Sequence, residues 1–388
     1  MAITMSTQLL RRGAGRLAAP WAVSSERTML MYGHRGASAR LAENTRAALT
    51  AALGESDGAE FDVQWLKCGT VVVLHDETLE RTALPWPGVE ASGGLDEQAY
   101  AKLIATNVNE LTYAEVQAVR VGWPKSQPPL PSASDSGDAS SLDPPYPAGG
   151  EQLMTLPDVL ALLVDGFPSK QFLIEVKGGD LVAAPLVQRD MLASGVTPAQ
   201  ARLIGSSLPT MVELKALLPA FDSVLICDQH TEADALAAVA QAAAANLNGV
   251  DLKADCGSVT RGVVDAAHAA GLPCLVWVDR SLPGADSHEA WDTLMCRGVD
   301  LFTSDMPPRV RPWLAYFQRA EALALELAAR AQSEHQLQQA SLLAAAASVA
   351  SAASPTAVSD LAPAYATIGG AGVLEGELEA APVALAAS

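Results

Sequence analysis

The sequence of 388 residues predicts a (β/α)8 barrel, and three observations support that prediction. Short apolar runs recur along the chain, and most carry Val, Ile, Leu or Phe on both faces, as buried parallel strands do. Helix-like segments lie between most of these runs. Polar, chemically reactive residues follow several of the runs. They would therefore lie at the carboxyl ends of the strands, where barrels of this kind carry their function.

Eight apolar runs are expected to form the barrel. They are residues 30–34, 59–64, 172–176, 202–206, 223–227, 249–253, 274–278 and 300–304. Helical patterns separate most of these runs, and Asn44 is the expected N-cap of the first helix. The expected helices are residues 45–53, 157–163, 184–193, 211–217, 232–244, 262–270 and 288–296.

An extra strand is expected beside the second barrel strand. Residues 71–74 are apolar and follow a tight turn at residues 67–70, so they should fold back on residues 59–66 as a β-hairpin. The return of this hairpin brings His75 towards Asp62. The expected fold is therefore a barrel with a hairpin added after its second strand.

Composition divides the chain into three parts. The barrel domain is expected at residues 29–313, and its Pro/Ser/Gly-rich insert at residues 122–150 cannot bury a core and is expected to be disordered. Residues 314–388 begin as an Ala/Leu-rich helical segment and continue as a disordered, low-complexity tail. The leader, residues 1–28, carries four arginines and one acid, which fits either a transit-like peptide or a disordered terminus.

The composition also limits the possible partners and compartments. A formal net charge of −19 argues against binding to nucleic acid, whose phosphate backbone needs a positive surface. No apolar run reaches the ~18 to 20 residues that a transmembrane helix needs. The five cysteines show no disulfide framework, which favours a reducing, intracellular compartment. Because the leader resembles a transit peptide, a plastid or a mitochondrion is an expected location alongside the cytoplasm.

Three carboxylates are expected to form a metal site. Strand side chains alternate, so Glu60 and Asp62 share one face of their strand. Glu175 lies near the end of another strand and adds a third carboxylate. Grouped carboxylates repel one another and favour a hard divalent cation, Mg²⁺ or Ca²⁺. The lack of a Cys–His cluster argues against zinc.

Imidazole and cationic side chains accompany the carboxylates. His34 and Arg35 follow the first strand, and His75 follows the hairpin. Lys177 lies two residues after Glu175. Taken alone, Glu175 and Lys177 could form a structural ion pair, and His75 could belong to a turn. Their joint occurrence at strand ends favours metal-assisted attack on a phosphate ester, with two histidines for acid and base catalysis.

The order of these motifs resembles the glycerophosphodiester phosphodiesterase family over about residues 29–312. The matching segments are His34-Arg35-Gly36, Glu43-Asn44-Thr45, residues 58–63, residues 75–82, residues 154–160, Glu175-Val176-Lys177, Trp277, residues 298–300 and residues 304–307. Each motif is modest, whereas the ordered set is highly specific. Departures at Val278-Asp279-Arg280, Ser206-Ser207-Leu208 and Cys68-Gly69 remove no group expected to do chemistry, but the first two leave the substrate alcohol open.

The resemblance implies hydrolysis of glycerophosphodiesters to sn-glycerol 3-phosphate and an alcohol, with a small-molecule substrate. It implies that His34 and His75 are the acid and base. Glu60, Asp62 and Glu175 would hold the metal. Arg35 and Lys177 would bind the phosphate, and Trp277 would form the apolar wall under the glycerol.

Two other functions stay open on the sequence. The same site could cleave lysolipids in the manner of a lysophospholipase D, which would need an exposed apolar rim. A catalytically silent barrel would act as a binding protein, and such a barrel is expected to lose a histidine or a carboxylate that this chain retains. The sequence does not distinguish Mg²⁺ from Ca²⁺, or the acid from the base among the two histidines.

Overall fold

A computed structural model describes residues 29–123, 149–279, 281–282, 284–310, 312–313, 330 and 332–345. The leader, most of the insert and the low-complexity tail lie outside the described residues. The chain divides into two compact units, Met1–Gln318 and Arg319–Ser388. The described part of the second unit is helical over residues 332–345, and its side chains are exposed.

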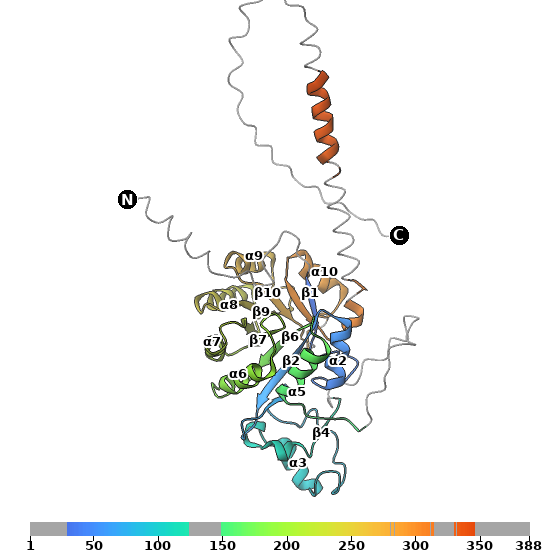
Figure 1. The fold of residues 1–388 in the computed structure, drawn as a ribbon, viewed down its shortest axis with the longest axis vertical. Helices are drawn as coiled ribbons and strands as arrows, with labels where there is room; N and C mark the ends of the chain where they lie inside the picture. The colour runs from blue at the N-terminus through green and yellow to red at the C-terminus, as the bar shows by residue number, and fades with distance from the viewer. Residues whose placement is uncertain are drawn as a thin grey trace, which may run out of the picture. The chain divides into compact units, whose positions relative to one another are not determined.

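The first unit is built around a closed barrel of eight parallel strands (Figure 1). In ring order these are β1 (Leu30–Gly33), β2 (Gly58–Trp65), β6 (Gln171–Val176), β7 (Ala201–Gly205), β8 (Ser223–Cys227), β9 (Gly249–Lys253), β10 (Cys274–Trp277) and β11 (Leu301–Ser304). The ring closes because β1 pairs with both β2 and β11. The predicted barrel is confirmed, and its strand ends differ from the expected ones by at most one residue.

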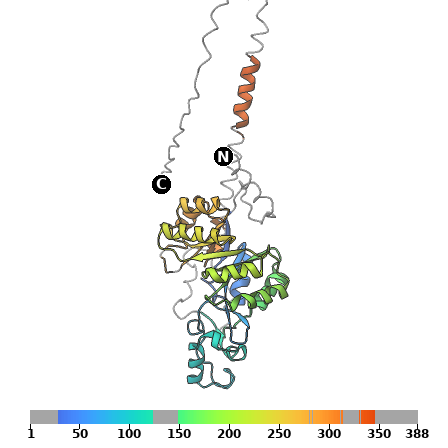
Figure 2. The same ribbon diagram turned by 90° about the vertical axis from the view of Figure 1, so that its left-hand side faces the viewer.

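Helices cover the outside of the barrel (Figures 1 and 2). They are α2 (Arg46–Glu55), α5 (Leu156–Ala161) with its π-helical continuation η3 (Leu162–Gly166), α6 (Ala183–Ser194), α7 (Leu208–Leu217), α8 (Glu232–Ala244), α9 (Arg261–Ala269) and α10 (His288–Cys296). The main hydrophobic core joins these helices to the outer faces of the strands. Within it, Phe61 and Phe172 of adjacent strands pack edge to face with ring centroids 5.0 Å apart.

An apolar layer fills the interior of the barrel. It consists of Tyr32, Leu173, Ile204, Val224, Leu275 and Leu301, with Leu30 and Ile226 packed against it. Strand side chains that are two residues apart share a face. His34, Glu175 and Trp277 each lie two residues beyond a member of this layer, so they stand above an apolar floor at the carboxyl end of the barrel.

The first helix corrects one prediction. Thr45 rather than Asn44 is the N-cap of α2, and the Thr45 hydroxyl accepts a hydrogen bond from the Ala48 amide at 3.3 Å. Asn44 has a φ of 59° and directs its carboxamide to Asp62. Both residue types are good N-caps, so the sequence pattern alone could not separate the capping residue from the one used by the site.

A second, smaller hydrophobic core lies beyond β2. As expected, β3 (Val71–Val73) pairs antiparallel with β2 outside the ring. The chain continues through α3 (Glu97–Ala105), η1 (Val108–Glu110), α4 (Tyr113–Val116) and a two-stranded sheet of β4 (Arg120–Val121) and β5 (Glu151–Gln152). This region, which has its own buried cluster that includes Leu79 and Tyr100, forms one end of the unit in Figures 1 and 2. Of this region, the sequence pattern predicts only the hairpin.

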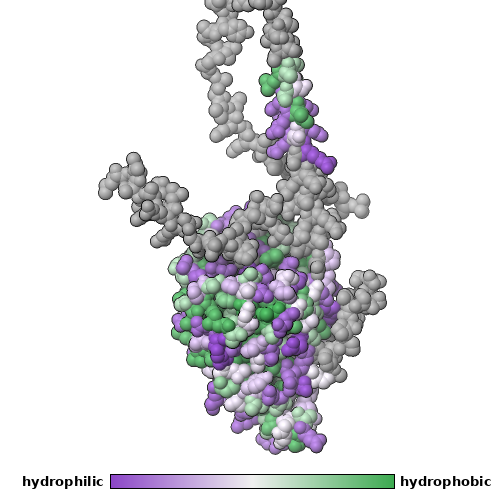
Figure 3. Space-filling model, in the orientation of Figure 1, coloured by the Kyte–Doolittle hydropathy of each residue, from purple (hydrophilic) through white to green (hydrophobic). Residues whose placement is uncertain are grey.

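The described surface offers no sign of a membrane span. Each helix among the described residues is too short or too polar to cross a bilayer. Figure 3 shows hydrophilic and hydrophobic residues interspersed over the viewed face of the first unit.

Candidate active site

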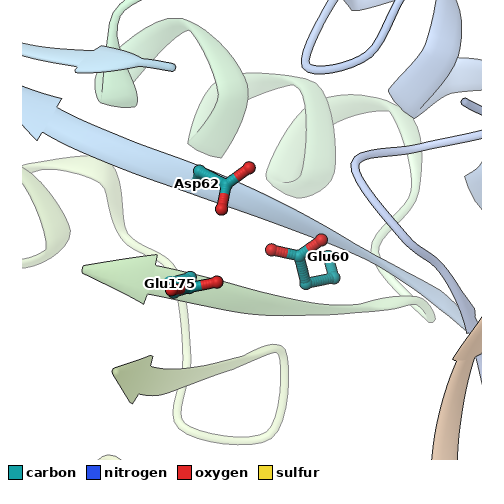
Figure 4. Close-up of side chains that lie close together, drawn as sticks. All are labelled: Glu60, Asp62 and Glu175. Carbon is teal, nitrogen blue, oxygen red and sulfur yellow. The ribbon is translucent and has the colours of Figure 1, made fainter. Parts of the chain in front are cut away.

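Three carboxylates converge at the carboxyl end of the barrel, as their spacing predicted. Glu60 and Asp62 extend from β2, and the strand register pairs Asp62 with Glu175 of β6. Each residue offers a carboxylate oxygen within 4.8 Å of those of the other two. Figure 4 shows the three carboxylates around a common space. Glu60 and Asp62 are buried, and Glu175 is half-buried.

Two cations neutralise part of this charge. The Lys177 Nζ lies 2.9 Å from Asp62 Oδ1 and 2.5 Å from Glu175 Oε1. The Arg35 guanidinium lies 3.4 Å from Asp62 Oδ2, and the Arg35 amide donates to Glu60 Oε2 at 2.7 Å. The predicted phosphate-binding residues therefore contact the predicted metal ligands directly.

The electrostatics of the carboxylates fit a bound cation. Burial, followed by the charges of Asp62 and Glu175, raises the pKa of Glu60 well above its usual range. Burial opposes ionisation of Asp62 as well, but Lys177 and Arg35 hold its pKa well below the usual range. Among the described residues, the buried Glu60 Oε1 has no hydrogen-bond partner. A buried, unpaired oxygen amid other carboxylates is the environment that a hard divalent cation would satisfy.

The first histidine contacts a residue that lies near the C-terminal end of the barrel domain in the sequence. His34 Nδ1 lies 2.9 Å from Asp305 Oδ1, which also accepts a hydrogen bond from the Ser38 hydroxyl. The Asp305 amide donates to Asp286 at 2.9 Å. Burial and the charge of Asp305 raise the pKa of Asp286 to about 6. Asp305 belongs to a motif found in the sequence, but its contact with His34 was not predicted.

The second histidine lies in a similar arrangement. His75 Nδ1 is 2.6 Å from Asp76 Oδ1, and Arg81 donates to both oxygens of Asp76 at 2.6 and 3.0 Å. Arg81 also forms two hydrogen bonds to Glu43, which in turn accepts one from Arg35. A continuous network thus links the hairpin residues to the first barrel strand.

The backbone after β1 adopts a tight turn that positions Arg35. Arg35 has a φ of 54° and Gly36 a φ of 83°. A Cβ at Gly36 would lie 2.5 Å from the backbone of Ala48 on α2, so only glycine fits between the turn and the helix. Asn44 completes this turn by donating to Asp62 at 2.7 Å.

Two adjacent cavities lie at this site and share part of their lining. The inner cavity of about 90 Å³ is lined by His34, Arg35, Glu60, His75, Glu175, Lys177, Ile204, Ile226, Asp251 and Trp277. The outer cavity of about 270 Å³ shares four of these residues, His34, Arg35, His75 and Trp277. Its other lining residues are Asp76, Arg81, Val278, Asp279 and Ser281. All predicted site residues therefore lie together: seven line the inner cavity, and Asp62 contacts two of them.

Sequence reasoning missed several polar residues of the site. Asp305 and Arg81 lie in matched segments of the sequence, but their contacts with His34 and Asp76 depend on the fold and were not predicted. Asp286 has no such motif and contacts the site through Asp305. Asp251 carried a usable signal, because a lone carboxylate inside the apolar run Val250-Asp251-Leu252 is rarely buried without a reason.

The fold and site define a (β/α)8 barrel with a carboxylate cluster flanked by two histidines. The family model for the glycerophosphoryl diester phosphodiesterase family matches residues 34–309. The chain belongs to this family.

Known proteins agree with this assignment. The chain is 50% identical over 54 residues to a glycerophosphodiester phosphodiesterase of Caldanaerobacter subterraneus subsp. tengcongensis, covering 14% of this chain and 22% of that protein. The matches to curated relatives span only 22% to 35% of their lengths.

Solved structures share the fold. A glycerophosphodiester phosphodiesterase of Agrobacterium tumefaciens aligns with a TM-score of 0.51 at 20% identity, over 72% of this chain and 97% of that one. An Oleispira antarctica phosphodiesterase, solved in complex with the product sn-glycerol-3-phosphate, aligns with a TM-score of 0.54 at 17% identity, over 73% of this chain and 95% of that one.

Proposed function

We propose that this protein hydrolyses glycerophosphodiesters to sn-glycerol 3-phosphate and an alcohol, with a divalent metal and histidine acid/base catalysis. The observation that carries the proposal is the inner cavity, where two histidines, two cations and the cluster carboxylates Glu60 and Glu175 face one small space. Membership of the family supports the same reaction.

The cations of the site would bind and orient the phosphate. Arg35 and Lys177 both line the inner cavity, and each is held in place by Asp62. The transition state of phosphodiester cleavage gathers negative charge on the non-bridging oxygens, which fixed cations stabilise. A divalent cation held by Glu60, Asp62 and Glu175 would supply further charge stabilisation as a Lewis acid.

The histidines would exchange protons with the attacking and leaving oxygens. Each has a carboxylate within hydrogen-bond distance of Nδ1, Asp305 for His34 and Asp76 for His75. Such a partner fixes the ring orientation and assigns proton exchange to Nε2. Trp277 lines both cavities and would form the apolar wall against the glycerol carbons.

The outer cavity favours a small, polar alcohol over a lipid. Six of its nine lining residues are charged or titratable, namely His34, Arg35, His75, Asp76, Arg81 and Asp279. A lysolipid chain would need an apolar rim there. This lining supports water-soluble glycerophosphodiesters as the substrate class.

The test is an assay of the purified full chain on a panel of glycerophosphodiesters that differ in the alcohol. We expect release of sn-glycerol 3-phosphate, loss of activity with EDTA, and recovery with Mg²⁺ or Ca²⁺. Full activity after metal removal would contradict the metal site. Cleavage of lysolipids alone would favour the lysophospholipase D reaction instead.

A further inference from the structure

Asp251 is a buried carboxylate that the reaction described above does not use. It lies on β9, is fully buried, and lines the inner cavity. Neither of its oxygens has a hydrogen-bond partner among the described residues. An unpaired buried carboxylate destabilises a fold, so a ligand that pairs with it would explain its presence.

The strand neighbours of Asp251 are apolar. In the strand register it lies beside Ile226 of β8 and Leu275 of β10, which belong to the apolar interior of the barrel. Ile204 and Trp277 line the same cavity. In the ring of eight strands, β9 lies across from β2, which carries Glu60 and Asp62. The inner cavity therefore has a charged side and an apolar side, with Asp251 on the apolar side.

We propose that Asp251 accepts a hydrogen bond from a hydroxyl of the substrate's glycerol moiety and selects glycerol diesters over diesters that lack this hydroxyl. The inference rests on the proposed function and adds a specificity-determining residue to it. The glycerol carbons would contact Ile204, Ile226 and Trp277 while the phosphate occupies the charged side.

Other ligands fit Asp251 less well. A phosphate would be repelled by its carboxylate, and Arg35 and Lys177 offer the phosphate a better place. A divalent cation is better served by Glu60, Asp62 and Glu175, whose ligand atoms lie within 4.8 Å of one another and which do not include Asp251. A hydroxyl donates one proton and has a carbon skeleton that suits the apolar wall.

The test compares the best substrate of the panel with its two deoxy analogues, in which propane-1,2-diol or propane-1,3-diol replaces glycerol. Wild type should prefer the glycerol diester over at least one analogue by roughly 10- to 100-fold in kcat/KM. Asp251→Leu, which has a similar shape without oxygens, should lose a similar factor on the glycerol diester. On the disfavoured analogue it should change kcat/KM by less than about threefold. Asp251→Asn, which retains an acceptor, should keep part of the preference.

Two controls separate this role from a structural one. Ser223 is also buried, and within the described part of the chain its hydroxyl has no hydrogen-bond partner. It does not line the inner or the outer cavity, so Ser223→Ala should leave the preference unchanged. Thermal unfolding should show Asp251→Leu to be at least as stable as wild type, because an unpaired buried carboxylate is removed.

Several outcomes would overturn the inference. Equal losses on all three substrates together with a lower unfolding temperature would assign Asp251 a structural role. Equal losses that higher Mg²⁺ or Ca²⁺ concentrations restore would assign it to the cation. A wild-type enzyme that is active without preference overturns this inference alone, whereas inactivity on every glycerophosphodiester overturns the proposed function with it.

Discussion

The two histidines of the site each contact a carboxylate, but the carboxylates differ in their surroundings. Asp305 is 7% exposed and bound by Ser38, whereas Asp76 is more exposed and shared with Arg81. A buried carboxylate stabilises an adjacent imidazolium more strongly than an exposed one, because water screens the charge less. His34 therefore depends on its partner more than His75 does.

Replacing Asp305 by Asn should test this dependence. The amide keeps the shape but removes the charge and permits the wrong ring tautomer. We expect Asp305→Asn to lower kcat by roughly 10- to 100-fold with little change in KM, a smaller loss than the roughly 10²- to 10⁴-fold expected for His34→Ala. The measurement is the pH profile of kcat, in which the limb that reports His34 should shift.

A second His–Asp pair provides the matched control. Asp300 lies 2.7 Å from His268 Nε2, and neither residue lines the inner or the outer cavity. Asp300→Asn should leave kcat and its pH profile unchanged. If the Asp305 and Asp300 variants lost activity equally, with equal losses of stability, the Asp305 contact would be structural only.

At the scale of elements, the small core beyond β2 supports the hairpin side of the site. Leu79 is fully buried in this core and lies between His75 and Arg81 in the chain. The positions of His75 and Arg81 therefore depend on the packing of this small core, which is separate from the main core around the barrel.

Shortening Leu79 should reduce catalysis as well as stability. Leu79→Ala creates a cavity that costs roughly 2 to 5 kcal/mol in a well-packed core, and even small displacements of catalytic groups lower rates by roughly 10- to 100-fold. Leu214→Ala on α7, equally buried in the main core, is the control and should lower the unfolding temperature with kcat unchanged. Equal kcat values for both variants would show that the small core does not position His75.

The barrel strands could be predicted because their evidence is local. Each is a short run rich in apolar residues, most of them are apolar on both faces, and the structure places their ends within one residue of the expected ones. The small core could not be predicted in this way, because α3 buries only Tyr100 and α4 only Val116, so neither shows an apolar stripe. Its buried residues come one at a time from separate segments.

The site residues also differ in whether a local pattern predicts them. Five of them follow or end apolar strands, and their spacing alone places them at one edge of the barrel: His34, Glu60, Asp62, His75 and Glu175. Asp305 lies 271 residues from His34 in the sequence, so only the closure of the ring brings the two together. Asp251 likewise lines a cavity whose other walls come from other strands, so its place in the site follows only from the fold.

At the scale of the whole molecule, several buried carboxylates oppose the folded state at neutral pH. Burial and the charge of Glu175 raise the pKa of Asp251 well above its usual range. The pKa of Glu60 is raised in the same direction, and that of Asp286 is raised from 3.8 to about 6. The formal net charge of −19 adds general self-repulsion.

These shifts predict that the metal-free protein becomes more stable on mild acidification. A carboxyl with a raised pKa binds its proton more tightly in the folded than in the unfolded state, so the free energy of unfolding falls as pH rises. For Asp286 the fall spans the interval from 3.8 to about 6. We expect the unfolding temperature in EDTA to rise by a few degrees between about pH 8 and pH 5.

Two further observations would distinguish the effect of these buried carboxyls from the effect of a general decrease in net negative charge on stability. Below about pH 4 the trend should reverse, because hydrogen bonds from His75 and Arg81 outweigh burial and lower the pKa of Asp76, and its protonation breaks them. Added Mg²⁺ or Ca²⁺ should flatten the slope at neutral pH, since a bound cation favours the ionised forms of Glu60 and Glu175. A metal-free protein whose stability increases steadily from pH 5 to pH 8 would show that these carboxylates are solvated or already paired in solution.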